Sequence, residues 1–301
     1  MTEWHDPIRQ IAIGIRKRVL EHVLANNGGY MSQACSSAEI FAMLYGRIMQ
    51  LGPSEGPLEP RRFDRVPGPG VPFVTGAEYN GARRPDTDRF IFSPAHYALV
   101  LYATLIEVGR LGPNGLSQFN EDGSTVEMIG AEHSPGVETT TGSLAQALSQ
   151  AGGIALARKR RGDSGKVWVM MSDGEFQEGQ TWEAIEALAR FELDNVRVIV
   201  DNNGQQCDGA LEGVPTQAPL ADRIIAFGAS AESVDGHDLD ALDDAMTRLT
   251  GRPHFVIANT NPVCGLELFG ERAPVLHYLR FTSDEERQRY VEAYDELKEM
   301  I

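Results

Sequence analysis

Short apolar segments alternate with helix-like segments from residue 89 almost to the end of the chain, and this alternation limits the fold more than any other feature. We read strands at residues 90–92, 167–171, 196–200, 231–234 and 254–258, and helices at 97–108, 181–190 and 239–249. Parallel strands need long crossover connections, which helices usually supply. The pattern therefore predicts an α/β fold, a doubly wound and mostly parallel sheet with helices on both faces. In such a sheet, ligands bind where the strands end.

The first 89 residues lack this alternation of strands and helices. Apolar residues three or four positions apart predict a helix at 7–24, and a capping box from Ser36 to Glu39 predicts that a second helix begins there. Seven of the 16 prolines then fall within residues 52–89, where no apolar period survives. We predict one domain over residues 1–301, with 52–89 as a proline- and glycine-rich loop insert.

Composition disfavours several classes of function. The net charge is −16 at pH 7, so the surface would repel nucleic acids and anionic membranes. The three cysteines, Cys35, Cys207 and Cys264, have no CxxC spacing, which disfavours a disulfide framework and a structural zinc site. The sequence has neither a signal-peptide pattern nor an apolar stretch of about 20 residues. We expect a soluble, cytoplasmic protein that binds neither nucleic acid nor membrane.

Polar residues directly follow two of the predicted strands. The run SDGE comes after residues 167–171, and the run DNNGQ comes after 196–200. Asp173 and Asn203, with a main-chain oxygen, would supply the oxygen ligands that Mg²⁺ or Ca²⁺ prefers when it holds a diphosphate. A Walker-type P-loop is absent from the sequence. Asp-Gly and Asn-Gly are each common turns when they occur alone, but together, after two successive strands, they predict a metal site.

At this spacing the sequence resembles the thiamine diphosphate signature, in which GDG is followed roughly thirty residues later by NN. The segments SDGEFQEGQTWEA and VIVDNNGQQCDG resemble transketolases more closely than pyruvate dehydrogenases or decarboxylases. The segments FIFSPAHYALVLYATL, SPGVETTTGSLAQAL and VDGHD also resemble transketolase segments, so the resemblance covers roughly residues 10–285. It implies the diphosphate-binding domain of the thiamine diphosphate-binding fold, with thiamine diphosphate and Mg²⁺ (or Ca²⁺) as cofactors.

The resemblance also implies roles for individual residues. The metal would be held by the side chains of Asp173 and Asn203 and by the main-chain oxygen of Gln205. Coenzyme contacts would come from His96, Gly142, Leu144, Asp173, Gly174, Glu175, Asn203 and His277. Catalytic roles would fall to Tyr30, His96, His133, Glu178 and Glu183. Tyr278 is an alternative to His277 at the diphosphate, and the two glutamates are equally explained as solvated acids in the first turns of a helix.

The sequence departs from the transketolase pattern at three places. Where transketolases usually have Gly-His-Pro-Gly, this chain has GYMS at residues 29–32, so Tyr30 replaces a histidine expected on the substrate side. His133 neighbours the position of another expected histidine. The usual Thr-x-Lys-Gly-x-Gly run reads TNPVCG at residues 260–265, without the lysine. These departures concern the substrate and leave the metal motif intact.

Transketolases carry a second domain whose glutamate bonds the pyrimidine ring of the coenzyme, and we find no second apolar-periodic domain in this sequence. We therefore expect the N-terminal subunit of a split transketolase. It would transfer a two-carbon ketol unit from a ketose sugar to an aldehyde, together with a separately encoded C-terminal, pyrimidine-binding subunit in an α₂β₂ complex. Two alternatives stay open: a 2-oxo acid dehydrogenase-type α subunit, and a non-catalytic coenzyme-binding or regulatory module.

Overall fold

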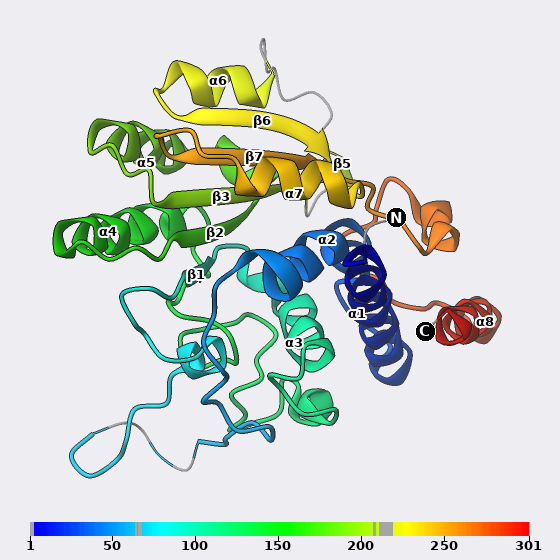
Figure 1. Ribbon diagram of the computed structural model, residues 1–301. Coiled ribbons are helices and arrows are strands. Elements are labelled where there is room, and N and C mark those ends of the chain that lie inside the picture. The colour runs from blue at the N-terminus through cyan, green and yellow to red at the C-terminus, as the bar shows by residue number, and fades with distance from the viewer. Residues whose placement is uncertain (1–2, 64, 66–67, 207–208, 211–218, 301) are drawn as a thin grey trace.

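Five parallel strands form the central sheet of the computed structural model (Figure 1), which describes residues 3–63, 65, 68–206, 209–210 and 219–300. The strands are β1 (Arg89–Phe92), β2 (Val167–Ser172), β3 (Val196–Asn202), β6 (Ser230–Asp235) and β7 (His254–Asn259). Their order across the sheet is β1-β2-β3-β7-β6, and every neighbouring pair is parallel. Separately from this sheet, β4 (Gln205–Gln206) and β5 (Gly209–Ala210) pair antiparallel. The predicted α/β class is confirmed.

Helices cover both faces of this sheet, which confirms the doubly wound arrangement (Figure 1). One hydrophobic core joins one face to α1 (His5–Asn26), α2 (Met31–Met43), α3 (Ala98–Glu107), α7 (Leu239–Thr247) and α8 (Asp284–Glu299). A second core joins the other face to α4 (Gln146–Arg161), α5 (Gly179–Arg190) and α6 (Leu220–Ala226). Successive side chains of a strand point to opposite faces, so Met170 lies in the first core and its neighbours Val169 and Met171 lie in the second. Both faces are buried, which explains why the strands are continuous apolar runs.

Helix α2 differs from the prediction. It begins at Met31 and not after Ser36, so Ser36 and Glu39 lie inside the helix and the predicted capping box is wrong. Their side chains bond to distant partners: the Ser36 hydroxyl donates to Asp201 (2.6 Å), and the Glu39 carboxylate accepts from Arg16 (2.6 and 2.7 Å). Serine and glutamate cap a helix only when their side chains bond to the local backbone. Here long-range partners take both side chains.

The described residues of the proline-rich segment 52–89 are mostly irregular, with a 3₁₀ helix at Gly76–Asn80. Gly76 is packed so closely that an added Cβ would lie 1.6 Å from the carbonyl oxygen of Ser134. No other residue type fits at this position without moving the backbone. The contact ties the insert to the loop that carries His133.

Among the described residues, none of the helices combines the length and the apolar character needed to cross a membrane. Cys35 and Cys264 are free thiols, while Cys207 lies outside the described residues. The extent of a single domain over residues 1–301 stays a prediction.

Candidate active site

The ends of β2 and β3 place the two predicted metal ligands close together. These strands are neighbours in register up to the last residue of β2, so Asp173 and the turn that contains Asn203 leave the sheet side by side. Asp173 opens a 3₁₀ turn, and its carboxylate accepts the main-chain N–H groups of Gly174 (2.8 Å) and Gly204 (2.7 Å). The Gly204 bond joins the loop after β2 directly to the loop after β3.

Asn203 is oriented by its own hydrogen bonds. Its Oδ1 accepts the main-chain N–H of Gln205 (2.9 Å), and because that N–H can only donate, the orientation of the amide is fixed. Its Nδ2 donates to the Tyr97 hydroxyl (3.0 Å) and to Asp201 (2.9 Å). Oδ1 therefore keeps a second lone pair for a cation, at a site that the main chain of Gln205 adjoins.

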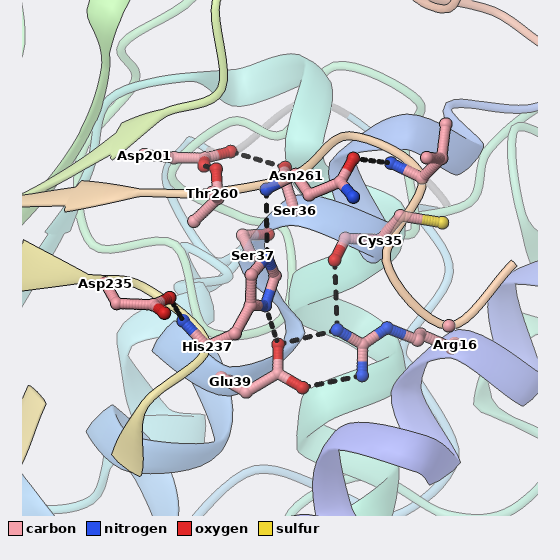
Figure 2. A network of polar contacts seen from close by, with 12 residues as sticks. Arg16, Cys35, Ser36, Ser37, Glu39, Asp201, Asp235, His237, Thr260 and Asn261 are labelled. Carbon is pink, nitrogen blue, oxygen red and sulfur yellow. Dashed lines mark hydrogen bonds and ion pairs between the residues drawn. The ribbon is translucent and has the colours of Figure 1, made fainter. Parts of the chain in front are cut away.

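Asp201, near the end of β3, is a residue to which the sequence analysis gave no role. It is fully buried and accepts four hydrogen bonds, so it organises this end of the sheet. The donors are the hydroxyls of Ser36 (2.6 Å), Tyr97 (2.9 Å) and Thr260 and the amide of Asn203 (2.9 Å). Ser36 and Thr260 converge on it from separate segments (Figure 2). The sequence feature that could have revealed Asp201 is an acidic residue near the end of an apolar strand, directly before Asn202 and Asn203.

The electrostatics of this cluster favour a cation. The pKa of Asp173 is raised to about 7, mainly because the carboxyl is buried and also because the charge of Asp201 lies nearby. Burial also raises the pKa of Asp201, although its hydrogen bonds oppose the shift. Every donor to the two carboxylates in the described part of the chain is neutral. Two buried carboxylates without a positive partner are unfavourable, and a divalent cation would remove that penalty.

The donor set is suited to a metal that also binds a diphosphate. Within the residues that the structure describes, no three His, Cys, Asp or Glu side chains gather as a metal site. A cation at Asp173 would therefore rely on this carboxylate, the Asn203 amide oxygen and the Gln205 main-chain oxygen. Its remaining ligands would be water and phosphate oxygens, which is how Mg²⁺ usually binds phosphate compounds. The residues fit a metal–diphosphate pair better than a metal alone.

Glu175 holds three loops together. Its side chain is fully buried and accepts the main-chain N–H groups of Ser172 (3.0 Å) and Ala145 (2.9 Å) and the hydroxyl of Ser93. The Ser172–Glu175 pair forms the capping box of the 3₁₀ turn that Asp173 opens. All of these contacts are within the chain itself. They hold the 3₁₀ turn, the end of β1 and the loop of Ala145 together, while the predicted contact of Glu175 with the coenzyme stays a prediction.

The loop predicted to grip the coenzyme is anchored at its ends and exposed in its middle. The Thr141 hydroxyl donates to the carbonyl of Phe92, at the end of β1. Ala145 has φ 71°, a left-handed conformation that costs a residue with a Cβ roughly 1–2 kcal/mol, and its N–H bond to Glu175 holds it there. Gly142 and Leu144 lie between these anchors and are exposed. The loop is therefore fixed in position yet accessible to a ligand.

Three predicted residues from distant segments form a cluster of rings. Tyr30 lies before α2, His96 lies in the 3₁₀ turn after β1, and His277 lies near the C-terminus. The Tyr30 ring centroid is 5.7 Å from that of His96 and 5.4 Å from that of His277, and the two imidazoles are 5.3 Å apart. Burial lowers the pKa of His96 to about 4, with a further contribution from His277. His96 is therefore neutral at pH 7.

A short backbone pairing brings this C-terminal segment to the start of α2. Gly29 and Leu279 exchange two hydrogen bonds (3.1 and 2.9 Å), which places His277 and Tyr278 beside Tyr30. The ring centroids of Tyr30 and Tyr278 are 5.1 Å apart. Both candidates for the diphosphate contact thus lie against Tyr30, and His277 also lies against His96. Which of the two would meet the diphosphate stays a prediction.

The other three predicted catalytic residues have different surroundings. His133 Nε2 lies 3.1 Å from a carboxylate oxygen of Glu127, and its ring packs edge-on against Phe63. Glu178 immediately precedes α5, Glu183 lies within its first turns, and both are exposed. These positions suit solvated acids near the start of a helix and also leave both acids accessible to a partner chain. The catalytic roles of all three stay predictions.

The chain is similar to several known proteins. The family model described as "Transketolase, thiamine diphosphate binding domain" matches residues 77–267. A transketolase family protein of Sinorhizobium fredii is 34% identical, over 90% of this chain and 89% of its own length. An apulose-4-phosphate transketolase subunit of Actinobacillus succinogenes is 30% identical, over 97% of this chain and 98% of its own length. A 6-deoxy-6-sulfo-D-fructose transketolase subunit of a Clostridium species is 29% identical, over 94% and 95% respectively.

Solved structures show the same fold in longer chains. A transketolase of Pichia stipitis has a TM-score of 0.71 and 21% identity, and the match covers 98% of this chain and 45% of that one. A transketolase of Campylobacter jejuni also has a TM-score of 0.71 and 21% identity, and 47% of it is covered. The chain thus spans about half the length of these transketolases, whereas it matches nearly the whole of the two relatives named as subunits.

Proposed function

Since this chain belongs to the transketolase family, through its thiamine diphosphate-binding domain, we propose that it is the N-terminal subunit of a two-chain transketolase. Such an enzyme moves a two-carbon ketol unit from a ketose to an aldehyde. The observation that carries the proposal is the pairing of Asp173 and Asn203 after adjacent parallel strands, joined by the Gly204 N–H bond to Asp173. This pairing supports the proposal because it would form a metal–diphosphate site at the place where α/β sheets bind ligands.

Mg²⁺ is the metal we propose, held by Asp173, Asn203 and the main-chain oxygen of Gln205. The oxygen donors suit Mg²⁺, and Ca²⁺ is chemically acceptable at the same donors. The metal would neutralise the two buried carboxylates and the diphosphate together. Metal and coenzyme binding should therefore depend strongly on each other.

When bound, thiamine diphosphate supplies the reactive carbon and the electron sink for ketol transfer. The residues of this chain bind and orient it. His96 and His277 are neutral imidazoles, each able to donate one N–H to a phosphate oxygen. The exposed residues Gly142 and Leu144 would pack against the body of the coenzyme, and the Tyr30 hydroxyl would face the substrate in place of the histidine usual in the family.

A separately encoded C-terminal subunit would complete the active site. Two relatives of almost the same length are themselves named as transketolase subunits, which supports the split arrangement. Leu144, within the loop between Thr141 and Ala145, is 38% exposed, and Ile129 is 45% exposed. Ile129 lies beside this loop, because a Cβ on Gly142 would be 3.6 Å from it. We propose that these side chains, with Glu178 and Glu183, face the partner in an α₂β₂ complex.

A cytoplasmic location is also proposed for this protein. Cys35 and Cys264 are free thiols, and free thiols are typical of a reducing compartment.

Reconstitution tests the proposed function. The chain would be purified with the protein that co-purifies with it from its host, and ketol transfer would be assayed with thiamine diphosphate, Mg²⁺ and a panel of ketose donors. The panel would include apulose-4-phosphate and 6-deoxy-6-sulfo-D-fructose, the compounds in the names of two relatives. We expect transfer only when both chains are present. Sustained transfer by this chain alone would disprove the split arrangement, and absence of metal-dependent coenzyme uptake by the two-chain complex would disprove the proposal as a whole.

A further inference from the structure

Gln33 of helix α2 contacts His277, a residue 244 positions later in the chain. Gln33 is 2% exposed. Its Nε2 lies 3.2 Å from the His277 ring atom Nδ1 and 3.4 Å from the His277 main-chain oxygen. Its Oε1 accepts a hydrogen bond from the Ser32 hydroxyl (3.1 Å). The amide of Gln33 is thus bonded at both ends.

The partners of Gln33 fix which end of its amide faces the histidine. The main-chain oxygen of His277 can only accept a hydrogen bond, so the NH₂ end must face it. The second hydrogen of that NH₂ group then points to Nδ1 of the ring. Nδ1 must therefore be an acceptor, which means that it carries no proton.

The remaining nitrogen of the His277 ring then carries the proton. Burial lowers the pKa of His277, so the ring is neutral at pH 7 and has a single N–H. With Nδ1 unprotonated, this N–H is on Nε2. Contacts with the rings of Tyr30 and His96 hold the imidazole plane, and the described residues offer Nε2 no hydrogen-bond partner.

We propose that Gln33 is a positioning residue that fixes His277 as the Nε2–H tautomer, so that this N–H is available to the diphosphate of the coenzyme. The inference rests on the proposed function for the identity of the ligand, but the tautomer itself is a property of the chain alone. A ring with the proton on Nδ1 would turn a lone pair toward the phosphate oxygens, and two acceptors facing each other repel. Gln33 prevents that arrangement before the coenzyme binds.

Nitrogen NMR of the ¹⁵N-histidine-labelled full chain, without coenzyme, tests the tautomer directly. The His277 signals are assigned by their loss in His277→Asn. We expect Nδ1 with the shift of an unprotonated ring nitrogen and Nε2 with the shift of a protonated one. The reverse pattern in the wild-type chain would overturn the proposal without any variant of Gln33.

Two variants test whether Gln33 sets this state. Gln33→Leu removes the donor at similar size, and we expect a mixture of both tautomers. Gln33→Glu offers an acceptor in place of the donor, and we expect a proton on Nδ1. A His277 spectrum that neither substitution alters would show that Gln33 does not control the ring.

Coenzyme affinity provides the second measurement. Calorimetric titration of the two-chain complex with thiamine diphosphate and Mg²⁺ should show a roughly three- to tenfold weaker affinity for Gln33→Leu, the effect of one neutral hydrogen bond. Gln118→Leu is the matched control, because Gln118 is also buried and donates instead to the Pro60 carbonyl (3.0 Å). It should leave both the His277 spectrum and the affinity unchanged, and equal losses in both variants would mean that Gln33 only stabilises the fold. Failure of the wild-type two-chain complex to bind coenzyme would count against the proposed function, while a tautomer that follows Gln33 would still support the positioning role.

Discussion

The side chain of Glu39 in α2 is 13% exposed and Asp201 in β3 is fully buried, but the two carboxylates have different kinds of partner. Figure 2 shows both of them with their neighbours. Glu39 accepts two hydrogen bonds from the Arg16 guanidinium (2.6 and 2.7 Å) and lies 2.9 Å from Nδ1 of His237. Among the residues that the structure describes, Asp201 accepts hydrogen bonds from hydroxyl and amide groups alone. In this part of the chain, Glu39 therefore has a fixed cation and Asp201 has none.

The difference is visible in the preferred charge states. Burial opposes ionisation of Glu39, but the His237 hydrogen bond and the Arg16 charge outweigh it and lower the pKa to about 2. Burial beside Asp201 raises the pKa of Asp173 to about 7. The Glu39 cluster is therefore complete within the described chain, whereas the Asp173–Asp201 cluster is electrostatically suited to a cation from outside.

The two clusters share their supports. Helix α2 contributes Glu39 to one cluster and Ser36 to the other. The loop after β7 contributes Thr260, which donates to Asp201, and Asn261, whose main-chain N–H donates to Nε2 of His237 (2.8 Å). The hydrogen bonds of the Glu39 cluster thus hold helix α2 and the loop after β7, and these two segments position Ser36 and Thr260 around Asp201.

Asp173→Asn should produce the largest effect, because it removes the only carboxylate among the proposed metal ligands. We expect metal-dependent thiamine diphosphate binding to be lost, a weakening of at least about a thousandfold, or about 4 kcal/mol. The metal-free chain should become more stable at pH 8, since a buried charge beside Asp201 is gone. Calorimetric titration and denaturant unfolding measure the two effects. Unchanged coenzyme affinity would contradict the metal assignment.

Glu39→Gln should lower the free energy of unfolding and leave coenzyme binding nearly unchanged. Removing one partner of a buried ion pair leaves Arg16 without its counter-charge, which typically destabilises a protein by about 3–5 kcal/mol. Coenzyme affinity should change little, because Glu39 belongs to the complete cluster. Denaturant unfolding at pH 7 measures the loss. A loss below about 1 kcal/mol would show that the two carboxylates do not differ as described.

The free energy of unfolding should change with pH in opposite directions for Glu39 and for Asp173. The pKa of Glu39 is lowered from 4.5 to about 2 on folding, so its stabilisation is present above about pH 4.5 and disappears as the pH falls toward 2. The difference in unfolding free energy between wild type and Glu39→Gln should shrink over that interval. The pKa of Asp173 is raised from 3.8 to about 7, so the metal-free chain should lose stability as the pH rises from about 4 to 7. Unfolding series with wild type and both variants test these signs, and parallel profiles would contradict them.

The raised pKa of Asp173 also predicts how coenzyme binding depends on pH. Mg²⁺ binds the ionised form of Asp173, so the affinity for Mg²⁺ and thiamine diphosphate should fall by up to about tenfold per pH unit below pH 7. Titrations between pH 8 and 6 measure the slope, with EDTA-treated protein as the metal-free control. A flat profile would mean that Asp173 is already ionised over this range.

Tyr30→Phe should produce the smallest effect. The phenylalanine ring can keep the contacts with His96 and His277, while the hydroxyl proposed to face the substrate is lost. Turnover of the assembled two-chain enzyme should fall roughly three- to tenfold with coenzyme affinity nearly unchanged. Loss of coenzyme affinity with normal turnover at saturation would identify Tyr30 as a coenzyme or packing residue.

Much of the fold could be predicted from the sequence, because strands buried on both faces must be apolar along their whole length. The two metal-ligand candidates could be placed for the same reason, since Asp173 and Asn203 are polar residues directly after such strands. The start of α2 could not be predicted, because Ser36 and Glu39 bond to partners far away in the sequence. The contact of Gln33 with His277 was likewise hidden, since nothing local marks a pair 244 residues apart.

The loop between Thr141 and Ala145 can reach its final conformation only late in the synthesis of this half of the sheet. Ala145 is held in its left-handed conformation by the carboxylate of Glu175, which is synthesised 30 residues later. Glu175 in turn reaches its place only when β1 and β2 have paired, because it also bonds Ser93 and Ser172. During synthesis the loop therefore leaves the ribosome before the residue that shapes it. The capacity to bind the coenzyme should be acquired only after this half of the sheet has assembled, so a partly folded chain would not capture it.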